Sequence, residues 1–321
     1  MRKQSYYGSY RGRTGARDVL KVVAVLLLIL LVLSLGAFFF LQKYMVYSDD
    51  GTARLELPFM KDEAPTDEQT LPPVETPGMD MDVEILPPAE PVRIMPVSLS
   101  RAALYDGTAS ELVTEGGGTA ALFDMKADTG ELGWVSDQPL AIAAKVTGDD
   151  PAVNIAMTAA AENDEVYRIA RVSCFKDDLL SNADTNLAIL TNSGYRWTDP
   201  AKVHWVSPAS ETVRDYLTGL CVELAGLGFD EILLDHAGYP TQGNLHYIKK
   251  GAAYDAAAFE TVISGFYAQV AEALEGTDVK LSVVYDAETA ALSGQSEQGI
   301  AAAGAKAVLR DETGALRWPE T

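Results

Sequence analysis

Short apolar runs alternate with stretches of helical periodicity along residues 93–321. The runs predict six strands, at residues 93–99, 119–126, 167–175, 230–235, 279–286 and 306–310. Apolar side chains on single stripes predict helices at 208–226 and 256–275, and weaker stripes predict helices at 153–162 and near 102–113. Strands that alternate with helices are typical of right-handed β-α-β units, and therefore of a parallel sheet.

The first of the two long helices has recognisable start and stop signals. Ser207 is placed to cap it, Pro208 suits its first position, and Gly226 or Gly228 suits its end. Six β/α units are visible, whereas a closed eight-stranded barrel usually takes about 250 residues. Only 229 residues follow Val92. The predicted fold class is therefore α/β, a TIM-barrel-like parallel fold that is trimmed or incomplete.

Residues 22–41, VVAVLLLILLVLSLGAFFFL, contain no charged side chain. Twenty apolar residues in a helix span about 30 Å, the thickness of a bilayer core, so this segment predicts a transmembrane signal-anchor helix. Six Lys and Arg residues precede it in the tail 1–21. The positive-inside rule places that tail in the cytoplasm and the C-terminal domain outside it, in a single-pass protein of the cell membrane. A cleaved signal peptide is the alternative, but its apolar core would be shorter.

Residues 48–92 differ in composition from everything that follows. They hold eight prolines and twelve acidic residues against two basic ones. Such a segment cannot bury enough apolar surface to offset the entropy lost on ordering. It predicts a disordered, extended linker in front of a folded domain at 93–321. Whether its short piece ARLELPF (53–59) pairs or docks is left open.

The chain has a formal net charge of −21, although residues 1–47 carry seven basic residues and one acidic residue. The remainder is strongly acidic, which argues against a nucleic-acid partner, because phosphate binding needs a basic face. Cys174 and Cys221 lie in apolar segments, so two buried thiols are expected, with a single disulfide as the alternative. The C-x-x-C spacing of metal sites is absent, and neither a metal nor a cofactor is expected.

Carboxylates recur where the predicted strands end. Asp124 and Asp235 close two strands, Asp177 follows a third, and Asp286 ends a fourth with Glu288 just beyond it. In parallel α/β folds, the loops at these strand ends converge on the ligand site. Glycoside hydrolysis uses two carboxyl groups, one as the acid and one as the nucleophile or base. These five residues are the catalytic candidates. The alternative is that each caps a strand-to-loop turn through backbone N–H groups.

Asp235 is the strongest of these candidates, because it ends the best-defined strand, within GFDEILLDHAGYP. A loop of about twenty residues follows, beginning with His236 and containing Tyr239. This loop either closes over a cleft or is an ordinary surface excursion. Trp197 lies near an element end, where an indole face suits stacking on a sugar ring, although most such tryptophans are packing residues.

The stretch from 167 to 240 resembles the glycosyl hydrolase domain found in bacterial surface proteins. The resemblance is carried by YRIARVSCFKD, NLAILTNSGYRWTDP and HWVSPASETVRDYLTGLCVELAGLGFDEILLDHAGYP, with ALFDMKADTGELGW matching upstream. It extends over roughly residues 93–310 and implies an α/β barrel related to the alpha-amylase-like hydrolases. The family would continue with further strands where this chain ends, near Trp318.

By this resemblance, Asp235 corresponds to the aspartate of the family motif F-D-E-I-x-x-D-Y-I-R-F-P. The family's D-x-K-x-x-x-G region is matched by Asp124, Lys126, Asp128 and Gly130. Its third-strand motif is matched by Arg171, Lys176 and Asp177. Where the family has Tyr-Ile-Arg, this chain has His236, Ala237 and Gly238, so the cation expected beside the carboxylate is missing. The candidate substrate-binding residues are Lys126, Arg171, Lys176, Trp197, His236 and Tyr239.

Two functions follow from these features. The first is a membrane-anchored, extracytoplasmic glycoside hydrolase acting on a polysaccharide or cell-wall glycan. The second is a catalytically degenerate barrel that binds glycan or protein at the cell surface, which the missing cation favours. A purely structural anchor for a membrane complex is a weaker third reading. An open sheet edge would also favour a homo-oligomer, because bare edges find partners.

Overall fold

In the computed structural model the chain separates into two units, Met1–Glu84 and Ile85–Thr321. The residues that the structure describes are 45–47, 53–55, 93–163 and 165–319.

The first unit contributes one small antiparallel pair, β1 (Met45–Tyr47) with β2 (Ala53–Leu55). The segment ARLELPF therefore supplies a strand, within the predicted linker. The predicted transmembrane helix at 22–41, the tail before it and most of the linker lie outside the described residues. In the described parts of the chain, no helix is long and apolar enough to cross a membrane.

The second unit is built on one seven-stranded sheet. Its strands lie side by side in chain order: β3 (Pro96–Leu99), β4 (Ala120–Lys126), β5 (Tyr167–Ser173), β6 (Glu231–Asp235), β7 (Lys280–Tyr285), β8 (Lys306–Arg310) and β9 (Leu316–Arg317). Pairing is parallel from β3 to β8, and β9 is antiparallel to β8. Parallel strands in sequential order are the arrangement of the α/β barrel. Here β3 and β9 are opposite edges of the described sheet, so the fold is an open half-barrel.

All six predicted strands are confirmed, because each is a near-continuous apolar run between turn signals. The seventh strand, β9, has two residues and leaves no periodicity to detect. Among the helices, α7 (Phe259–Ala273) and α4 (Ala152–Asn163) confirm the predictions at 256–275 and 153–162. The helix predicted near 102–113 is interrupted and forms η1 (Arg101–Leu104) and α2 (Ala109–Glu115).

The predicted cap of the first long helix is wrong. Helix α6 (Glu211–Gly226) begins three residues later than expected, and its cap is Ser210, whose hydroxyl accepts from the Val213 N–H. Ser207 instead donates its hydroxyl to the Ala253 carbonyl. The predicted end at Gly226 is confirmed.

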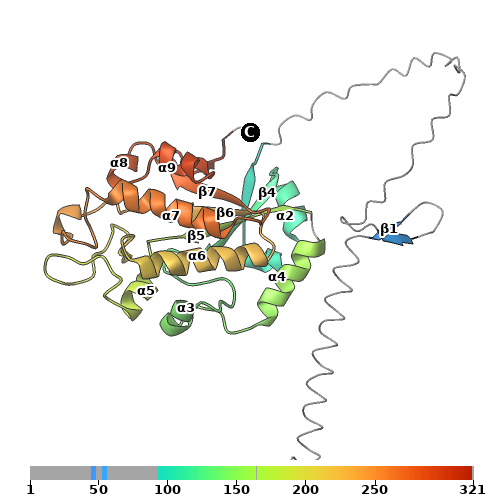
Figure 1. Ribbon diagram of the computed structural model, residues 1–321, viewed down its shortest axis with the longest axis horizontal. Coiled ribbons are helices and arrows are strands. Elements are labelled where there is room, and N and C mark those ends of the chain that lie inside the picture. Colours follow the sequence, from blue (N-terminus) through green and yellow to red (C-terminus); the bar gives the residue numbers. More distant parts are fainter. Residues whose placement is uncertain (1–44, 48–52, 56–92, 164, 320–321) are drawn as a thin grey trace, which may run out of the picture. The chain divides into compact units, whose positions relative to one another are not determined.

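Five short helices in the loops were not predicted, because they lack a repeating apolar stripe. They are α3 (Pro139–Ala144), α5 (Asp178–Ala183), η2 (Leu245–Tyr247), α8 (Ala290–Ser293) and α9 (Glu297–Ala302). Helices α6 and α7 lie next to each other against the sheet (Figure 1).

The sheet has two differently packed faces. One face contributes Phe123 and Val172 to the large core shared with the helices. The other face carries a smaller apolar cluster of Ala120, Leu122, Ile169, Leu233, Val284, Val308 and Trp318. Side chains alternate along a strand, so residues two positions beyond this cluster share its face. At the carboxyl ends of the strands, those residues are Asp124, Arg171, Asp235 and Arg310.

Candidate active site

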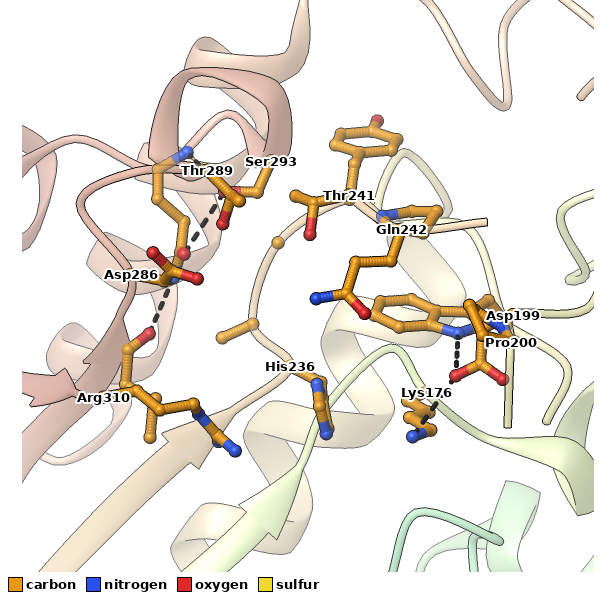
Figure 2. Close-up of a pocket in the computed structure, with 17 residues that line it drawn as sticks. Lys176, Asp199, Pro200, His236, Thr241, Gln242, Asp286, Thr289, Ser293 and Arg310 are labelled. Carbon is orange, nitrogen blue, oxygen red and sulfur yellow. Dashed lines mark hydrogen bonds and ion pairs between the residues drawn. The ribbon is translucent and has the colours of Figure 1, made fainter. Parts of the chain in front are cut away.

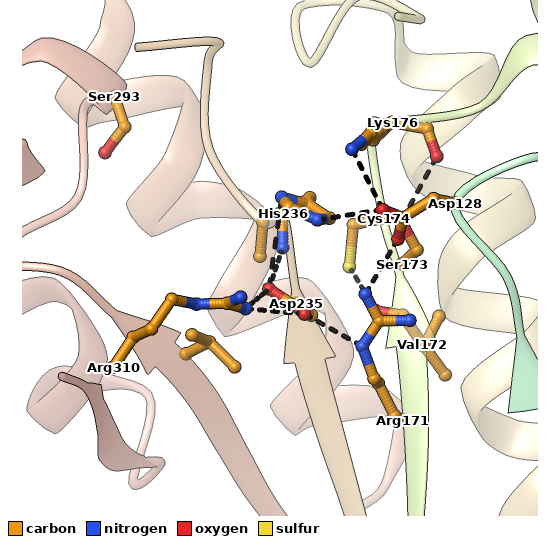
Figure 3. A network of polar contacts seen from close by, with 12 residues as sticks. Asp128, Arg171, Val172, Ser173, Cys174, Lys176, Asp235, His236, Ser293 and Arg310 are labelled. Atoms are coloured by element: carbon orange, nitrogen blue, oxygen red, sulfur yellow. Dashed lines mark hydrogen bonds and ion pairs between the residues drawn. The ribbon is translucent and has the colours of Figure 1, made fainter. Parts of the chain in front are cut away.

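The carboxylate of Asp235 lies between two arginines at the carboxyl end of β6 (Figure 3). Arg171 Nε on β5 is 2.8 Å from Oδ2, and Arg310 Nη2 on β8 is 2.7 Å from each oxygen. The backbone N–H of His236 also donates to Oδ1 at 2.8 Å. Burial alone would raise the pKa of Asp235, but His236, Arg171 and Arg310 lower it to about 2. Asp235 is therefore an ionised, fully hydrogen-bonded carboxylate.

Arg171 joins three carboxylates. Its Nε contacts Asp235, Nη1 contacts Asp124 Oδ1 at 2.7 Å, and Nη2 contacts Asp128 Oδ1 at 2.7 Å. Although burial would lower the pKa of the Arg171 guanidinium, the neighbouring carboxylates raise it above its usual value. A guanidinium with three anionic partners is held rigidly and stays charged. Arg171 therefore positions the acids of β4 and β6 against each other.

The network continues through Asp128, which follows β4. Its Oδ2 lies 2.9 Å from Lys176 Nζ and 3.3 Å from His236 Nε2. Burial opposes ionisation of Asp128, but His236, Arg171 and Lys176 hold the pKa of that carboxyl well below its usual range. Lys176 also lies 3.2 Å from Asp199 Oδ2.

His236 is held in an uncommon backbone conformation, with φ at 47° in the left-handed region. Its ring lies edge-on to Trp205, with centroids 5.7 Å apart, and it contacts Asp128 through Nε2. Strained backbone of this kind persists where surrounding contacts fix it, and it is common at ligand sites. His236 is thus held in a fixed position where it lines the cavity.

An open cavity of about 290 Å³ lies above this network (Figure 2). Its lining includes three predicted binding residues, Lys176, His236 and Tyr239, and one predicted catalytic residue, Asp286. Asp286 lies on one side of the cavity, and Lys176 with Asp199 on the other (Figure 2). Half of the other lining residues are polar, namely Thr241, Gln242, Thr289, Ser293, Gln295 and Arg310. Such a mixture of hydroxyl, amide and charged groups suits a polyhydroxylated ligand.

Tyr239 contributes to this cavity from a packed position. Its ring stacks on Phe259 at a centroid distance of 3.6 Å and meets Tyr254 edge-on. Burial raises the pKa of Tyr239 to about 12, so the side chain is neutral across the physiological range. Trp197, in contrast, lies outside this cavity, where its Nε1 donates to the Asn244 carbonyl at 3.1 Å.

Asp177 and Lys126 lie together in the interior rather than in the cavity. Both side chains are buried, and Lys126 Nζ is 2.8 Å from Asp177 Oδ2. Asp177 caps α5 by accepting from the Leu180 N–H, and Lys126 donates to the Ser173 carbonyl. Gly130 packs so closely that an added Cβ would lie 2.1 Å from Asp177 Oδ1. Lys126 and Gly130 of the D-x-K-x-x-x-G region therefore pack against Asp177, which caps the start of α5.

The remaining predicted acids are more exposed. Asp124 ion-pairs with Arg171 at the surface, and Glu288 is exposed and does not line the cavity. Asp286 Oδ1 accepts from the Glu288 N–H at 3.0 Å, which is the turn-capping contact considered as an alternative for these acids. Of the five catalytic candidates, Asp286 is the one that lines the cavity, with Asp235 in the ion network below it.

The sequence prediction missed Arg310. The cation expected three residues after Asp235 is absent, yet Arg310 supplies a guanidinium from a strand end 75 residues away. A signal was present, since Arg310 ends a predicted strand as Asp235 does. Asp199, which shares Lys176 with Asp128, was missed for lack of any local pattern.

Within the described residues, no group of three or more His, Cys, Asp or Glu side chains is arranged to hold a metal ion. Cys174 and Cys221 are free, buried thiols, as expected. Burial raises the pKa of both thiols, that of Cys221 to about 12.

A family model described as "Putative glycosyl hydrolase domain" matches residues 106–303, more than half of the chain. No curated protein sequence matches. A solved structure of a hypothetical protein from Ruminiclostridium thermocellum is 25% identical, with 58% of this chain and 96% of that chain covered and a TM-score of 0.49.

Two solved glycosidase structures are also similar. The glycoside hydrolase domain of PgaB (BpsB) from Bordetella bronchiseptica is 12% identical, over 68% of this chain and 74% of that chain, with a TM-score of 0.47. Alpha-L-fucosidase isoenzyme 2 from Paenibacillus thiaminolyticus is 14% identical, over 60% of this chain, with a TM-score of 0.44. The match spans 32% of the fucosidase chain.

Proposed function

Because the chain belongs to this glycosyl hydrolase domain family, we propose that its second unit hydrolyses glycosidic bonds in a carbohydrate. We further propose that residues 22–41 anchor it in the membrane, with the tail 1–21 in the cytoplasm and the domain outside. The observation that carries the proposed activity is the placement of Asp235 and Asp286. Asp235 ends β6 within the ion network, and Asp286 directly follows the adjacent strand β7 and lines the cavity.

The two carboxyl groups are suited to different roles. Asp235 stays ionised because Arg171 and Arg310 flank it, so it serves as the anionic partner of the positively charged sugar that forms in the transition state. Asp286 serves as the acid: its proton passes to the leaving oxygen as the glycosidic C–O bond breaks. Water then adds to the sugar carbon and returns a proton to Asp286. Arg310 lines the cavity and holds Asp235, so it connects the bound carbohydrate to the buried charge.

One observation favours a second candidate, binding without hydrolysis. The Asp235 side chain is only 3% exposed, and both its oxygens accept hydrogen bonds from neighbouring groups. Attack on a sugar carbon by this carboxylate would require Arg171 or Arg310 to move. If neither arginine moves, the domain would bind glycan in the cavity without cleaving it.

The test is release of reducing ends from a panel of polysaccharides and aryl glycosides, with calorimetric binding measured in parallel. We expect Asp235→Asn and Asp286→Asn each to lower turnover about 100-fold or more. Glu288→Gln is the matched control, because this exposed acid lies two residues from Asp286 outside the cavity, and it should keep full activity. Binding without turnover in the unaltered protein would select the second candidate. Full activity in Asp235→Asn would contradict the first.

A further inference from the structure

A second groove, of about 320 Å³, lies beside the cavity, and none of the five predicted catalytic residues lines it. Two loops form it, residues 191–198 and the segment around Asn244 and Tyr247. We propose that this groove binds the continuation of a polymeric glycan whose scissile bond lies in the cavity. The substrate class would then be an extended, uncharged polysaccharide. This inference rests on the proposed function, because it takes carbohydrate as the occupant.

The composition of the groove indicates an uncharged ligand. Its lining consists of hydroxyl, amide and aromatic side chains, namely Thr191, Asn192, Ser193, Tyr195, Trp197, Thr198, Asn244 and Tyr247, together with Arg196. No carboxylate lines it, although the chain contains 46 Asp and Glu residues. The single charge, Arg196, is already engaged, because its Nη1 donates to Ser181 Oγ and to the Asp178 carbonyl.

Two tyrosines in the groove are unusually exposed for large aromatic residues. Tyr195 is 76% exposed and Tyr247 is 55% exposed. Such rings keep apolar faces in water and a hydroxyl available for hydrogen bonding, which suits a ligand with both C–H surfaces and hydroxyls. A sugar ring presents both. The aromatic faces and neighbouring amides therefore match carbohydrate better than an ionic ligand.

The groove is held in shape by contacts between its two loops. The Asn192 N–H donates to the Tyr247 carbonyl at 2.8 Å, and the Lys249 N–H donates to the Leu190 carbonyl at 2.8 Å. Trp197 Nε1 donates to the Asn244 carbonyl at 3.1 Å. These cross-loop bonds fix the walls before any ligand arrives, which lowers the entropy lost on binding.

The groove and the cavity share their walls. Trp197 and Thr198 line the groove while Asp199 and Pro200 line the cavity, so one loop forms part of both. The second loop behaves in the same way, since Gln242 lines the cavity and Asn244 the groove.

Gly243 lies between the two lining residues of that second loop. An added Cβ there would lie 3.1 Å from Pro200 Cδ and 3.4 Å from the Trp197 ring. The two loops are thus packed against each other where the cavity meets the groove, and one glycan chain can continue from the cavity to the groove over this shared wall.

The test uses the purified full-length chain in a detergent without a sugar headgroup. Native electrophoresis is run in gels containing starch, xylan, β-1,3-glucan or galactomannan, which retard a protein that binds them. We expect at least one polysaccharide to retard the protein, and Tyr195→Ala and Tyr247→Ala each to weaken that binding by about three- to tenfold. Tyr105→Ala is the matched control, because this tyrosine is 39% exposed and lies outside both sites.

The outcomes separate this inference from the proposed function. Retardation that both groove variants weaken, and that Tyr105→Ala leaves unchanged, supports the groove. The groove proposal is overturned if neither groove variant alters the retardation. It is also overturned if the protein cleaves short aryl glycosides but no polysaccharide retards it. In both of these cases the proposed hydrolysis still stands. Absence of both retardation and hydrolysis overturns the two proposals together.

Discussion

Arg310 Nη2 lies 2.7 Å from both carboxylate oxygens of Asp235, although the two residues are 75 positions apart. The contact crosses from β8 to β6, over the strand between them. The sequence pattern predicted a cation three residues after the aspartate, and the folded chain supplies one from another strand instead.

The first prediction concerns the pKa of Asp235. Arg310→Gln removes one of the cations that hold this pKa at about 2, so the pKa should rise toward its usual value. Carbon-detected NMR titration of the carboxyl group measures it directly. Lys306→Gln, at the start of the same strand, is the control and should leave it unchanged. An unaltered pKa in Arg310→Gln would show that the ion pair does not form.

The same pKa predicts how stability depends on pH. The folded-state value of about 2 lies below the ordinary value of about 3.9, so ionised Asp235 stabilises the fold above about pH 4. This contribution, about 2–3 kcal/mol, is lost as the pH falls from about 4 to about 2. Urea unfolding at several pH values should show a flatter acid limb in Asp235→Asn than in Asp286→Asn. Identical limbs would contradict the lowered pKa.

The buried pair of Lys126 and Asp177 predicts a large loss of stability. Asp177→Asn leaves the Lys126 ammonium in the interior without its partner, which should lower the free energy of unfolding by about 3–5 kcal/mol. Arg317→Gln breaks the exposed pair with Asp311 and should cost less than about 1 kcal/mol. Denaturant unfolding compares the two. Similar effects would mean that the interior pair is not stabilising.

Gly130 offers a test of the D-x-K-x-x-x-G region. Gly130→Ala combines a backbone φ of 102° with a Cβ placed 2.1 Å from Asp177 Oδ1, so it should destabilise by about 3 kcal/mol or more. Gly194→Ala is the matched control. That glycine also has positive φ, at 83°, but its added Cβ meets nothing within 4 Å, so only about 1–2 kcal/mol of backbone strain remains. Equal thermal shifts in the two variants would remove the steric explanation.

The last prediction concerns the opposite end of the sheet face. The buried carboxylate of Glu231 accepts from Trp318 Nε1 at 2.7 Å and from Tyr167 OH at 2.9 Å. Trp318→Phe leaves one of these oxygens unsatisfied, which should cost about 1–3 kcal/mol in unfolding experiments. Tyr195→Phe removes an exposed hydroxyl and should change stability little. No loss in Trp318→Phe would mean that water replaces the indole N–H.

Much of the fold followed from periodicity alone. Apolar runs located the strands β3 to β8, and their alternation with amphipathic helices specified a parallel sheet, because burial on both faces leaves that pattern in the residues themselves. Short elements such as α5 and β9 did not follow, since they are held by caps and neighbours rather than by a repeat. Ser207 and Ser210 are equally good N-cap residues by local sequence. Only the tertiary contact of the Ser207 hydroxyl with the Ala253 carbonyl distinguishes them.

For the candidate site, the sequence by itself determined that acids stand at the carboxyl ends of parallel strands. It could not determine which of them meet a cation, a cavity or the interior. Asp177 and Asp235 look alike along the chain, yet one is paired with Lys126 inside the domain and the other with Arg171 and Arg310. Those partners come from other strands, and only the tertiary structure brings them within the few ångströms over which ion pairs and desolvation set the charge of a carboxylate.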